Sequence, residues 1–417
     1  MTPLSSSPSE PHVVILGAGH GGGTLAALLR QYGHGGPITI VGSEPRLPYE
    51  RPPLSKAWLR GGLNPDSLAL RPEEFYRAEQ ITTRLGVTAR AIDRGRRSVA
   101  LDDGSTLDYD VLVIATGARP RRLPAECGDG DDVLHLRDQS DATRIRDSLG
   151  PGKRVVLCGG GYIGLEIAAA ARGHDMDVTV VEQQPRLLNR VASPQLAEFL
   201  RGYHEANSVR VVLSASVASV QREAGRVTAV ELATGEQLSC DVVVVGVGAE
   251  PRLELAADAG LPCAEGILVD ELARTADPDI FAIGDVTARP VPFRDGHVRL
   301  ESVPSTLEQA KQAAGAIAGR VRPVPEVPWF WSDQYDLKIQ IAGLYGPSLT
   351  TTARGVADDG MTVTHDDGDH LVSVEAVNRP GDFMIGKKLI GRRDPLGSTL
   401  LRNPTLTLRD LAKQPVQ

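Results

Sequence analysis

Cysteine is scarce in this chain, and the positions of the cysteines exclude several kinds of redox and metal chemistry. The 417 residues contain four cysteines, Cys127, Cys158, Cys240 and Cys263. Even the closest pair, Cys240 and Cys263, is too far apart in the chain for a C-x-x-C motif or a tight zinc-ligand spacing. Cys158 and Cys240 lie in apolar, strand-like runs. We therefore expect buried, reduced thiols, as is usual in cytosolic proteins, and no metal site.

Basic clusters, aromatic residues and long apolar runs are also scarce. The net charge is −8 and no block of basic residues is present, which argues against binding to nucleic acid. Aromatic residues make up 4% of the chain, so Val, Leu, Ile and Ala must build the cores. No apolar run reaches the roughly 18 residues of a membrane span. Residues 1–11 resemble no signal peptide. We expect a disordered tail at 1–11 and a cytoplasmic protein that binds no membrane.

An internal repeat organises most of the chain. The segment HVVILGAGHGGG at His12–Gly23 is echoed by RVVLCGGGYIGLE at Arg154–Glu166. Further on, LDYDVLVIATGARP at Leu107–Pro120 is echoed by LSCDVVVVGVGAEP at Leu238–Pro251. Each copy opens with a buried, parallel-type strand, a helix and a second strand. The predicted ranges are 13–16, 24–32 and 38–41 in the first copy, and 155–158, 164–172 and 178–181 in the second.

The first copy has a glycine motif with the context that a dinucleotide site requires. Gly17, Gly19 and Gly22 form G-x-G-x-x-G between a predicted strand and a predicted helix. Gly17 allows the tight turn, Gly19 lets the backbone approach a pyrophosphate, and Gly22 lets helix and strand pack closely. The start of the helix then offers free N–H groups to the phosphates. Glu44, near the end of the second strand, is suited to hold ribose hydroxyls.

The second copy repeats the pattern with Gly159, Gly161 and Gly164, and its acidic residue is Glu182. A carboxylate there accepts hydrogen bonds from a ribose 2′-OH and repels a 2′-phosphate. Two unit charges about 4 Å apart repel by on the order of 4 kcal/mol at an effective dielectric near 20. The residues after Glu182 are glutamines, not the arginine of a 2′-phosphate site. This favours NADH over NADPH, and two cradles in one chain imply a flavin paired with the nicotinamide.

Several further segments resemble the FAD-dependent ferredoxin reductases of bacterial oxygenase systems. They are ATG (Ala115, Thr116 and Gly117), TADPDIFAIGD ending at Asp285, LPYERPPLSKAWL at 47–59, RLESVPSTLEQA at 299–310 and PWFWSDQYDLKIQIAGL at 328–344. The resemblance is colinear from about His12 to about Pro404. It implies an α/β protein with two Rossmann-like, glutathione-reductase-like domains and a C-terminal α+β domain.

The resemblance also implies domain limits. The FAD-binding domain would comprise 12–117 and 250–325, the NADH-binding domain 118–249, and the C-terminal domain 326–417. Within these limits we expect a strand at 280–283, a helix at 300–319 and a linker at Pro323–Pro328. The segments LKIQIAGL, HLVSVEAV and GDFMIGKKLIG predict strands of the last domain.

By the same resemblance, one set of residues would hold FAD and another NADH. The FAD set is Gly17, Gly19, Gly21, Gly22, Ser43, Glu44, Arg51, Lys56, Ala89, Ala115, Thr116, Gly117, Arg137, Asp285 and Val303. Many relatives carry aspartate where this chain has Ser43, so Ser43 would contribute only its backbone. The NADH set is Gly159, Gly161, Tyr162, Ile163, Gly164, Glu182, Arg190 and Gly248.

The resemblance places Lys56 opposite Glu166 beside the reacting rings, with Glu301 nearby and Trp331 at the flavin edge. The alternatives are an ordinary ion pair for Lys56 and Glu166, and a core or rim position for Trp331. The implied partner is an acidic [2Fe–2S] ferredoxin that serves a cytochrome P-450 or a Rieske-type oxygenase. The basic residues nominated to meet it are Arg71, Lys311 and Lys338, and more weakly Lys387, Lys388, Arg392 and Arg393.

The absence of cysteine before Cys127 bears on where the electrons go. Glutathione-reductase-like proteins carry a redox disulfide early in the FAD domain, and NADH peroxidases carry a reactive cysteine there. Without such a thiol, a diffusible one-electron carrier is the simplest acceptor. The alternatives are a rubredoxin as acceptor, an oxidase using O₂, and a redox-sensing flavoprotein that acts as a binding module.

Overall fold

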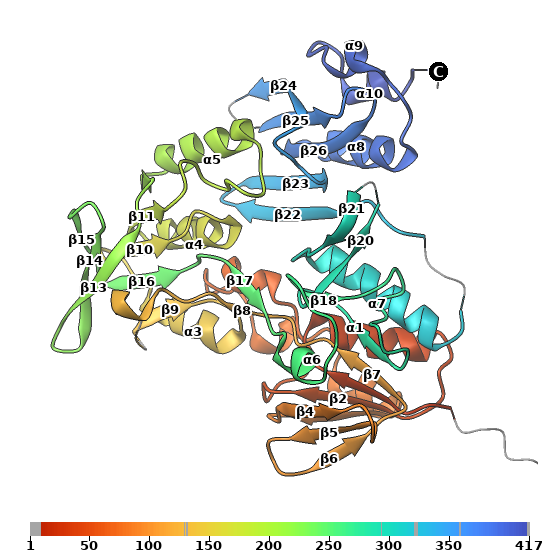
Figure 1. The fold of residues 1–417 in the computed structure, drawn as a ribbon. Helices are drawn as coiled ribbons and strands as arrows, with labels where there is room; N and C mark the ends of the chain where they lie inside the picture. Colours follow the sequence, from red (N-terminus) through yellow and green to blue (C-terminus); the bar gives the residue numbers. More distant parts are fainter. Residues whose placement is uncertain are drawn as a thin grey trace, which may run out of the picture. The chain divides into compact units, whose positions relative to one another are not determined.

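The computed structural model describes residues 10–128, 130, 132–292, 294–320, 324–357 and 360–414. Most of the expected tail at 1–11 lies outside these residues, as does Pro323 of the expected linker. The chain divides into two compact units, and each is described by itself (Figure 1). The first unit is Met1–Glu50, Asn64–Arg119 and Glu250–Glu326. The second unit is Arg51–Leu63, Pro120–Ala249 and Val327–Gln417.

A five-stranded parallel sheet forms the centre of the first unit. Its strand order is β19-β7-β1-β2-β3. The strands are β19 (Ile280–Ala282), β7 (Val111–Ile114), β1 (Val13–Leu16), β2 (Ile38–Gly42) and β3 (Ile81–Leu85). Every residue of β1 and β2 is buried, which explains why both are largely apolar, apart from Thr39 in β2, rather than alternating in polarity.

Helices α1 (His20–Gln31) and α7 (Val303–Ile317) lie side by side on one face of this sheet (Figure 1). Leu25, Leu29, Ala310 and Ala314 meet in their shared core, and the small alanines allow the two helices to approach closely. The other face is covered by a small antiparallel sheet of β4 (Ala89–Asp93), β5 (Ser98–Leu101) and β6 (Thr106–Asp108), together with α6 (Glu254–Asp258). The remaining elements are η2 (Pro65–Leu68), α2 (Glu73–Ala78), β18 (Ile267–Leu268), β20 (Thr287–Val291) and β21 (Arg294–Val298).

The second unit contains the second copy of the repeat. Its parallel sheet has the order β12-β11-β10-β16-β9. The strands are β12 (Val209–Leu213), β11 (Asp177–Glu182), β10 (Arg154–Cys158), β16 (Val242–Val245) and β9 (Val133–His135). The helices are α3 (Gln139–Ser148), α4 (Tyr162–Arg172) and α5 (Pro194–Ala206). Short elements complete this part: η1 (Pro52–Ser55), η3 (Ala125–Cys127), β13 (Val217–Glu223), β14 (Arg226–Leu232) and β15 (Gln237–Ser239). Strands β8 (Ala118–Pro120) and β17 (Ala249–Pro251) lie where the chain passes between units.

The C-terminal part of the second unit is a five-stranded antiparallel sheet with helices. Its strand order is β22-β23-β26-β25-β24. The strands are β22 (Trp329–Gln334), β23 (Leu337–Gly343), β24 (Thr350–Ala357), β25 (Gly360–Asp366) and β26 (Leu371–Val377). Helices α8 (Pro380–Arg392), α9 (Ser398–Leu401) and α10 (Leu408–Leu411) pack on it around Val374 and Phe383.

The prediction of a strand at GDFMIGKKLIG is wrong, because this segment is helix α8. Pro380 occupies the first turn, where its fixed φ favours a helix. The buried residues Phe383, Gly386, Leu389 and Ile390 then recur with helical spacing. A Cβ on Gly386 would lie 2.6 Å from Val374, so this glycine lets the helix approach the sheet.

The cysteines largely follow expectation. All four are free thiols, and three are buried, whereas Cys263 is partly exposed. Burial raises the pKa of Cys158 and of Cys240 to about 12, so neither is a ready nucleophile. Within the described ranges no group of His, Cys, Asp or Glu side chains is arranged to hold a metal ion. None of the helices in the described part of the chain combines the length and apolar character that a membrane crossing requires.

Candidate functional site

In the first glycine cradle, Gly17 and Gly22 occupy positions where a side chain would overlap the backbone. Gly17 has φ +128°, and a Cβ there would lie 2.2 Å from the carbonyl oxygen of Ala115. A Cβ on Gly22 would lie 2.0 Å from the carbonyl oxygen of Gly17, so only glycine lets α1 start this close to the end of β1. Around Gly19 the space is open to 4 Å. Helix α1 begins without a side-chain cap and without an acidic residue in its first turn.

The second cradle repeats these contacts. A Cβ on Gly159 would lie 2.4 Å from the carbonyl oxygen of Gly246, and one on Gly164 would lie 2.2 Å from that of Gly159. The space around Gly161 is again open to 4 Å, and α4 also starts with no side-chain cap and no acidic residue. Both helices therefore present free backbone N–H groups beside room for a ligand, and both cradles fit the diphosphate of a dinucleotide.

The carboxylate that follows each cradle is held in a defined position. Oε2 of Glu44, just after β2, accepts a hydrogen bond of 2.6 Å from the hydroxyl of Tyr49. Glu182 is the last residue of β11. Its Oε2 accepts a hydrogen bond of 2.7 Å from the backbone N–H of Gly160, inside the second glycine loop. Its Oε1 accepts a hydrogen bond of 2.8 Å from the backbone N–H of Gln184. Each carboxylate oxygen has a further lone pair, so Glu182 is oriented and still able to accept ribose hydroxyls.

The remaining FAD-type motifs of the first unit gather at one edge of its sheet. Strands β1, β7 and β19 run parallel, and their carboxyl ends are followed by Gly17, Ala115 and Ile283 respectively. The turn that carries Asp285 is tied to α7, because Oε1 of Gln309 accepts hydrogen bonds from the N–H of Gly284 (3.3 Å) and the hydroxyl of Thr287 (2.7 Å). In open α/β sheets ligands bind at this edge. Thr116 and Gly117 continue from Ala115, and Val303 starts α7.

Lys56 and Glu166 form a largely buried ion pair in the second unit. Their Nζ and Oε2 atoms lie 2.8 Å apart, and the side chains are 16% and 4% exposed. Lys56 follows η1, and Glu166 lies in the second turn of α4, the helix that starts at the second cradle. A buried charge pair is stable only when further hydrogen bonds satisfy its atoms. Here the hydroxyl of Ser55 donates a hydrogen bond to Oε2 of Glu166. The hydroxyl of Ser332 donates a hydrogen bond of 2.6 Å to Oε1 of the same carboxylate.

Strand β22 separates its side chains into two sets. One face of the strand carries Phe330, Ser332 and Gln334. The ring centroid of Phe330 lies 4.6 Å from that of Tyr162, at the start of α4. Trp329 and Trp331 point to the opposite face, since side chains alternate along a strand, and their rings lie 5.6 Å apart. Burial, with smaller contributions from nearby carboxylates, raises the pKa of Tyr162 well above its usual value, so this phenol stays neutral.

Other predicted site residues are distributed over both units. In the first unit Ser43 is exposed, Ala89 begins β4, and Glu301 is exposed and pairs with Arg299. In the second unit Arg51 donates to the backbone carbonyl of Arg137.

Three further predicted NADH-set residues belong to the second unit. Arg190 is exposed, and its guanidinium lies 3.5 Å from the Cβ position of Gly248. Ile163 is half exposed beside the glycine loop. The structure thus brings Arg190 and Gly248 together.

The nominated partner-binding residues are accessible but do not belong to one unit. Arg71 is exposed on the first unit, with its guanidinium 5.7 Å from the ring centroid of Phe75. Lys311, on α7 of the same unit, has its Nζ 3.3 Å from Glu326. Lys338 is exposed on β23 of the second unit. Their role in binding a partner stays a prediction.

Two serines that complete the Glu166 site were not found from the sequence. Ser55 directly precedes Lys56, and Ser332 directly follows Trp331, so both lie within motifs in which other residues carry the resemblance. Ser332 is 166 positions from Glu166 in the chain. No local sequence pattern indicates a contact over that separation. The contact appears only in the structure, where β22 packs against α4 within the second unit.

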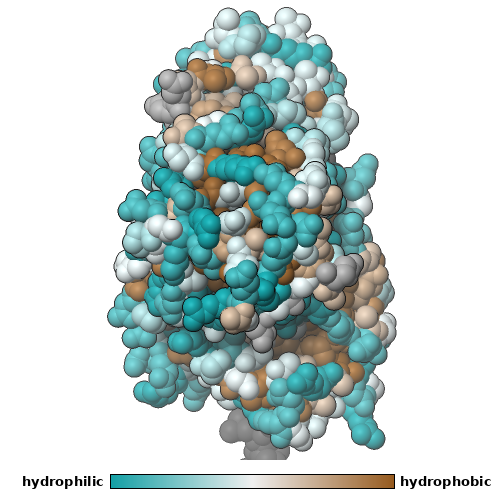
Figure 2. Space-filling view, turned by 90° about the vertical axis from the view of Figure 1, so that its left-hand side faces the viewer, coloured by the Kyte–Doolittle hydropathy of each residue, from teal (hydrophilic) through white to brown (hydrophobic). Residues whose placement is uncertain are grey.

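The surface adds one feature to the second cradle. Ile163 and Val191 are each 50% exposed, which is unusual for large apolar side chains. On the side of the molecule drawn in Figure 2, hydrophilic side chains predominate and hydrophobic residues gather in patches framed by them. Exposed apolar residues beside a glycine loop suit a nucleotide that binds and dissociates in each catalytic cycle.

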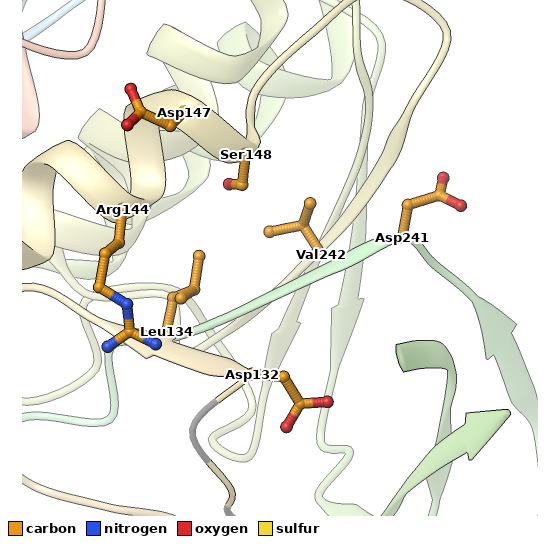
Figure 3. A pocket seen from close by; sticks show the side chains of 7 residues that line it. All are labelled: Asp132, Leu134, Arg144, Asp147, Ser148, Asp241 and Val242. Atoms are coloured by element: carbon orange, nitrogen blue, oxygen red, sulfur yellow. The ribbon is translucent and has the colours of Figure 1, made fainter. Parts of the chain in front are cut away.

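The second unit also contains a hollow of about 400 Å³ (Figure 3). It is lined by Asp132, Leu134, Arg144, Asp147, Ser148, Asp241 and Val242. These residues surround the amino ends of β9 and β16, whereas the glycine loop follows the carboxyl end of β10. Asp132 and Asp241 are already paired with Arg222 and Arg154. The hollow is therefore distinct from the second glycine cradle.

Comparison with known proteins agrees with this arrangement. Residues 11–315 match the family model described as pyridine nucleotide-disulphide oxidoreductase, and residues 329–412 match a reductase C-terminal model. The chain is 45% identical to a probable ferredoxin reductase of Castellaniella defragrans over 97% of this chain and 99% of that protein. It is 41% identical to rhodocoxin reductase of Rhodococcus erythropolis, over 92% and 90% of the two chains. Among solved structures, the covalent putidaredoxin reductase–putidaredoxin complex contains a chain with TM-score 0.93 and 38% identity, over 97% and 98%.

Proposed function

Because the chain belongs to the pyridine nucleotide-disulphide oxidoreductase family, we propose that it is a flavoprotein reductase that oxidises NADH and reduces a [2Fe–2S] ferredoxin. The observation that carries this proposal is the pair of glycine cradles with the same steric construction in one chain. We assign residues 12–117 and 250–325 to FAD, 118–249 to NADH, and 326–417 to the C-terminal domain. FAD held at the first cradle would supply the chemistry that links a two-electron hydride donor to a one-electron acceptor.

The residues of this chain have distinct tasks in that scheme. The free N–H groups at the start of α1 and α4 bind the two diphosphates. Glu182, fixed by two backbone N–H groups, accepts the ribose hydroxyls of NADH and disfavours a 2′-phosphate. Lys56, held by Glu166, supplies a fixed positive charge in a partly buried setting, where charges act more strongly than in water. No acid or base is required by hydride transfer, and none is assigned.

The acceptor follows from the cysteines and from the relatives. No cysteine precedes Cys127, so the chain lacks a thiol relay at the position where disulfide reductases have one. Relatives that match nearly the whole chain include a probable ferredoxin reductase, and a solved relative is joined to putidaredoxin. We propose that an acidic ferredoxin meets Trp331, Arg71, Lys311 and Lys338, and that it serves a cytochrome P-450 or a Rieske-type oxygenase. Rubredoxin is a less favoured acceptor.

An absorbance spectrum followed by titration tests this function. The purified protein should be yellow, NADH should bleach it anaerobically, and a [2Fe–2S] ferredoxin should be reduced rapidly while oxygen consumption stays slow. Protein that stays colourless after incubation with FAD would refute the proposal. A long-lived complex with NADH and negligible turnover would favour the redox-sensing alternative, and rapid oxygen consumption would favour the oxidase.

A further inference from the structure

The carboxylate of Glu166 is bound at both oxygen atoms, and one of these bonds comes from the C-terminal domain. Glu166 is 5% exposed. Its Oε2 atom meets the ammonium of Lys56 at 2.8 Å and the hydroxyl of Ser55. Its Oε1 atom accepts a hydrogen bond of 2.6 Å from the hydroxyl of Ser332, which is completely buried on β22. Ser332 therefore fixes the rotation of the carboxylate that holds Lys56.

The hydroxyl of Ser332 is itself oriented by the residues behind it. Nε2 of Gln334 donates a hydrogen bond of 3.2 Å to the Ser332 oxygen, so the single hydroxyl proton is left to point at Glu166. Oε1 of Gln334 lies 2.9 Å from Nε2 of His204 on α5. Gln334 and His204 are also fully buried. The three hydrogen bonds thus run in one direction, with His204 donating to Gln334, Gln334 to Ser332, and Ser332 to Glu166.

This arrangement is suited to positioning rather than to moving protons. The amide of Gln334 interrupts the chain, because an amide does not exchange protons readily between its nitrogen and its oxygen. Burial lowers the pKa of His204, so the imidazole is neutral and supplies no proton at ordinary pH. What the bonds can do is hold a charged group at one orientation in a water-poor setting, which supports preorganisation.

We propose that Ser332 is a positioning residue for the Lys56–Glu166 pair, and that the C-terminal domain in this way sets the rate at which NADH reduces the flavin. The inference rests on the proposed function. It assigns to the C-terminal domain a task in the first half of the reaction, separate from the partner contacts proposed for Trp331 on the other face of the same strand.

Single-turnover reduction of the holoenzyme by NADH tests the assignment. Ser332→Ala should slow flavin reduction by about tenfold, because a hydrogen bond to a charged group is lost. The Kd for NADH should stay within about twofold, since Glu166 does not belong to the glycine loop, and Ser332→Thr, which keeps the hydroxyl, should restore most of the rate. In a Glu166→Ala background, Ser332→Ala should slow the reaction no further.

Ser373→Ala is the matched control. Ser373 is equally buried in the same sheet, but its hydroxyl donates to the backbone carbonyl of Ala342 at 3.0 Å, not to Glu166. It should lower the melting temperature comparably and leave the rate of flavin reduction unchanged. Equal rates in Ser332→Ala and Ser373→Ala would overturn the inference, as would a Ser332→Ala effect that persists without Glu166. A wild-type flavin that NADH does not reduce would instead refute the proposed function.

Discussion

The two glycine cradles share one sequence pattern but differ in what surrounds them. In the first, a Cβ on Gly21 would lie 3.0 Å from Thr306 and 3.4 Å from Ile283, because α7 and the end of β19 press on the start of α1. In the second, the corresponding position is Ile163, whose side chain is 50% exposed. The returning segment, Glu250–Glu326, thus closes the first cradle within its own unit. A closed cradle suits a resident cofactor, and an open one suits a substrate that must leave after each turnover.

The carboxylates differ in a related way. Glu44 accepts a hydrogen bond from a side chain, the hydroxyl of Tyr49. Glu182 accepts hydrogen bonds at both oxygens from backbone N–H groups, those of Gly160 and Gln184. A carboxylate held at both oxygens by the backbone cannot move easily to relieve repulsion, and so it discriminates between ligands. We therefore expect Glu182 to make the second cradle selective for its nucleotide.

Alanine at the innermost glycine of each cradle should give the largest effects. Gly22→Ala should yield protein that retains no flavin or does not fold, because its Cβ would overlap the carbonyl of Gly17. Gly164→Ala should keep the yellow colour and raise the KM for NADH by about a hundredfold, since only the second cradle is distorted. Absorbance after gel filtration and steady-state kinetics measure these outcomes. Gly202→Ala, at an exposed site in α5 with no neighbour within 4 Å, should instead stabilise the protein slightly.

Glu182→Arg should change nucleotide preference by about a hundredfold or more toward NADPH, because a repulsion of about 4 kcal/mol is replaced by an attraction. The measurement is the ratio of kcat/KM for NADH and NADPH. Glu44→Gln is the comparison variant, and it should leave that ratio unchanged. An unaltered ratio in Glu182→Arg would contradict the selectivity assigned to the second cradle.

Exchanging the residues at the Gly21 and Ile163 positions tests closure directly. Gly21→Ile should lower the free energy of unfolding by about 1–3 kcal/mol and accelerate flavin loss, because the new side chain has no room beside Thr306. Ile163→Gly should cost roughly 1 kcal/mol, the usual cost of glycine in a helix. Thermal unfolding and flavin release measure both. Flavin release from Gly21→Ile at the wild-type rate would show that the first cradle has room for a side chain at this position.

The smallest effect is expected at Lys311, on the helix that closes the first cradle. Lys311→Glu should raise the KM for ferredoxin by about three- to tenfold at low salt, because a charge that steers an acidic partner is reversed. Reduction of ferricyanide should not change. Lys413→Glu, at another exposed lysine, is the control for net charge. If ferricyanide reduction falls in parallel, Lys311 acts through its contact with Glu326 on the fold instead.

The sequence predicts what is local and misses what is distant. Gly17, Gly22 and Glu182 are recognisable because a turn, a close approach and a strand end each require a residue type at a fixed spacing. Helix α8 is hard to recognise from the sequence because its interior glycines weaken the helical pattern, and the role of Gly386 appears only in its contact with Val374 of the sheet.

Buried polar groups were the other omission. Arg289 and Glu308 form an ion pair with both side chains at most 5% exposed. Removing Arg289 alone would leave Glu308 buried and unpaired, so breaking this pair is expected to destabilise the first unit strongly. No local pattern marks either residue, because the pairing depends on how β20 packs against α7.

The two faces of β22 have a practical consequence for redesign. Trp331 and Ser332 are neighbours in the chain, yet one points toward a proposed docking area and the other toward Glu166. A grafted C-terminal domain chosen for a new electron acceptor would bring its own residue opposite Glu166. Swaps that preserve serine there, with Gln334 behind it, should yield working chimeras, whereas swaps judged only by their outer surface should give proteins that bind well and turn over slowly.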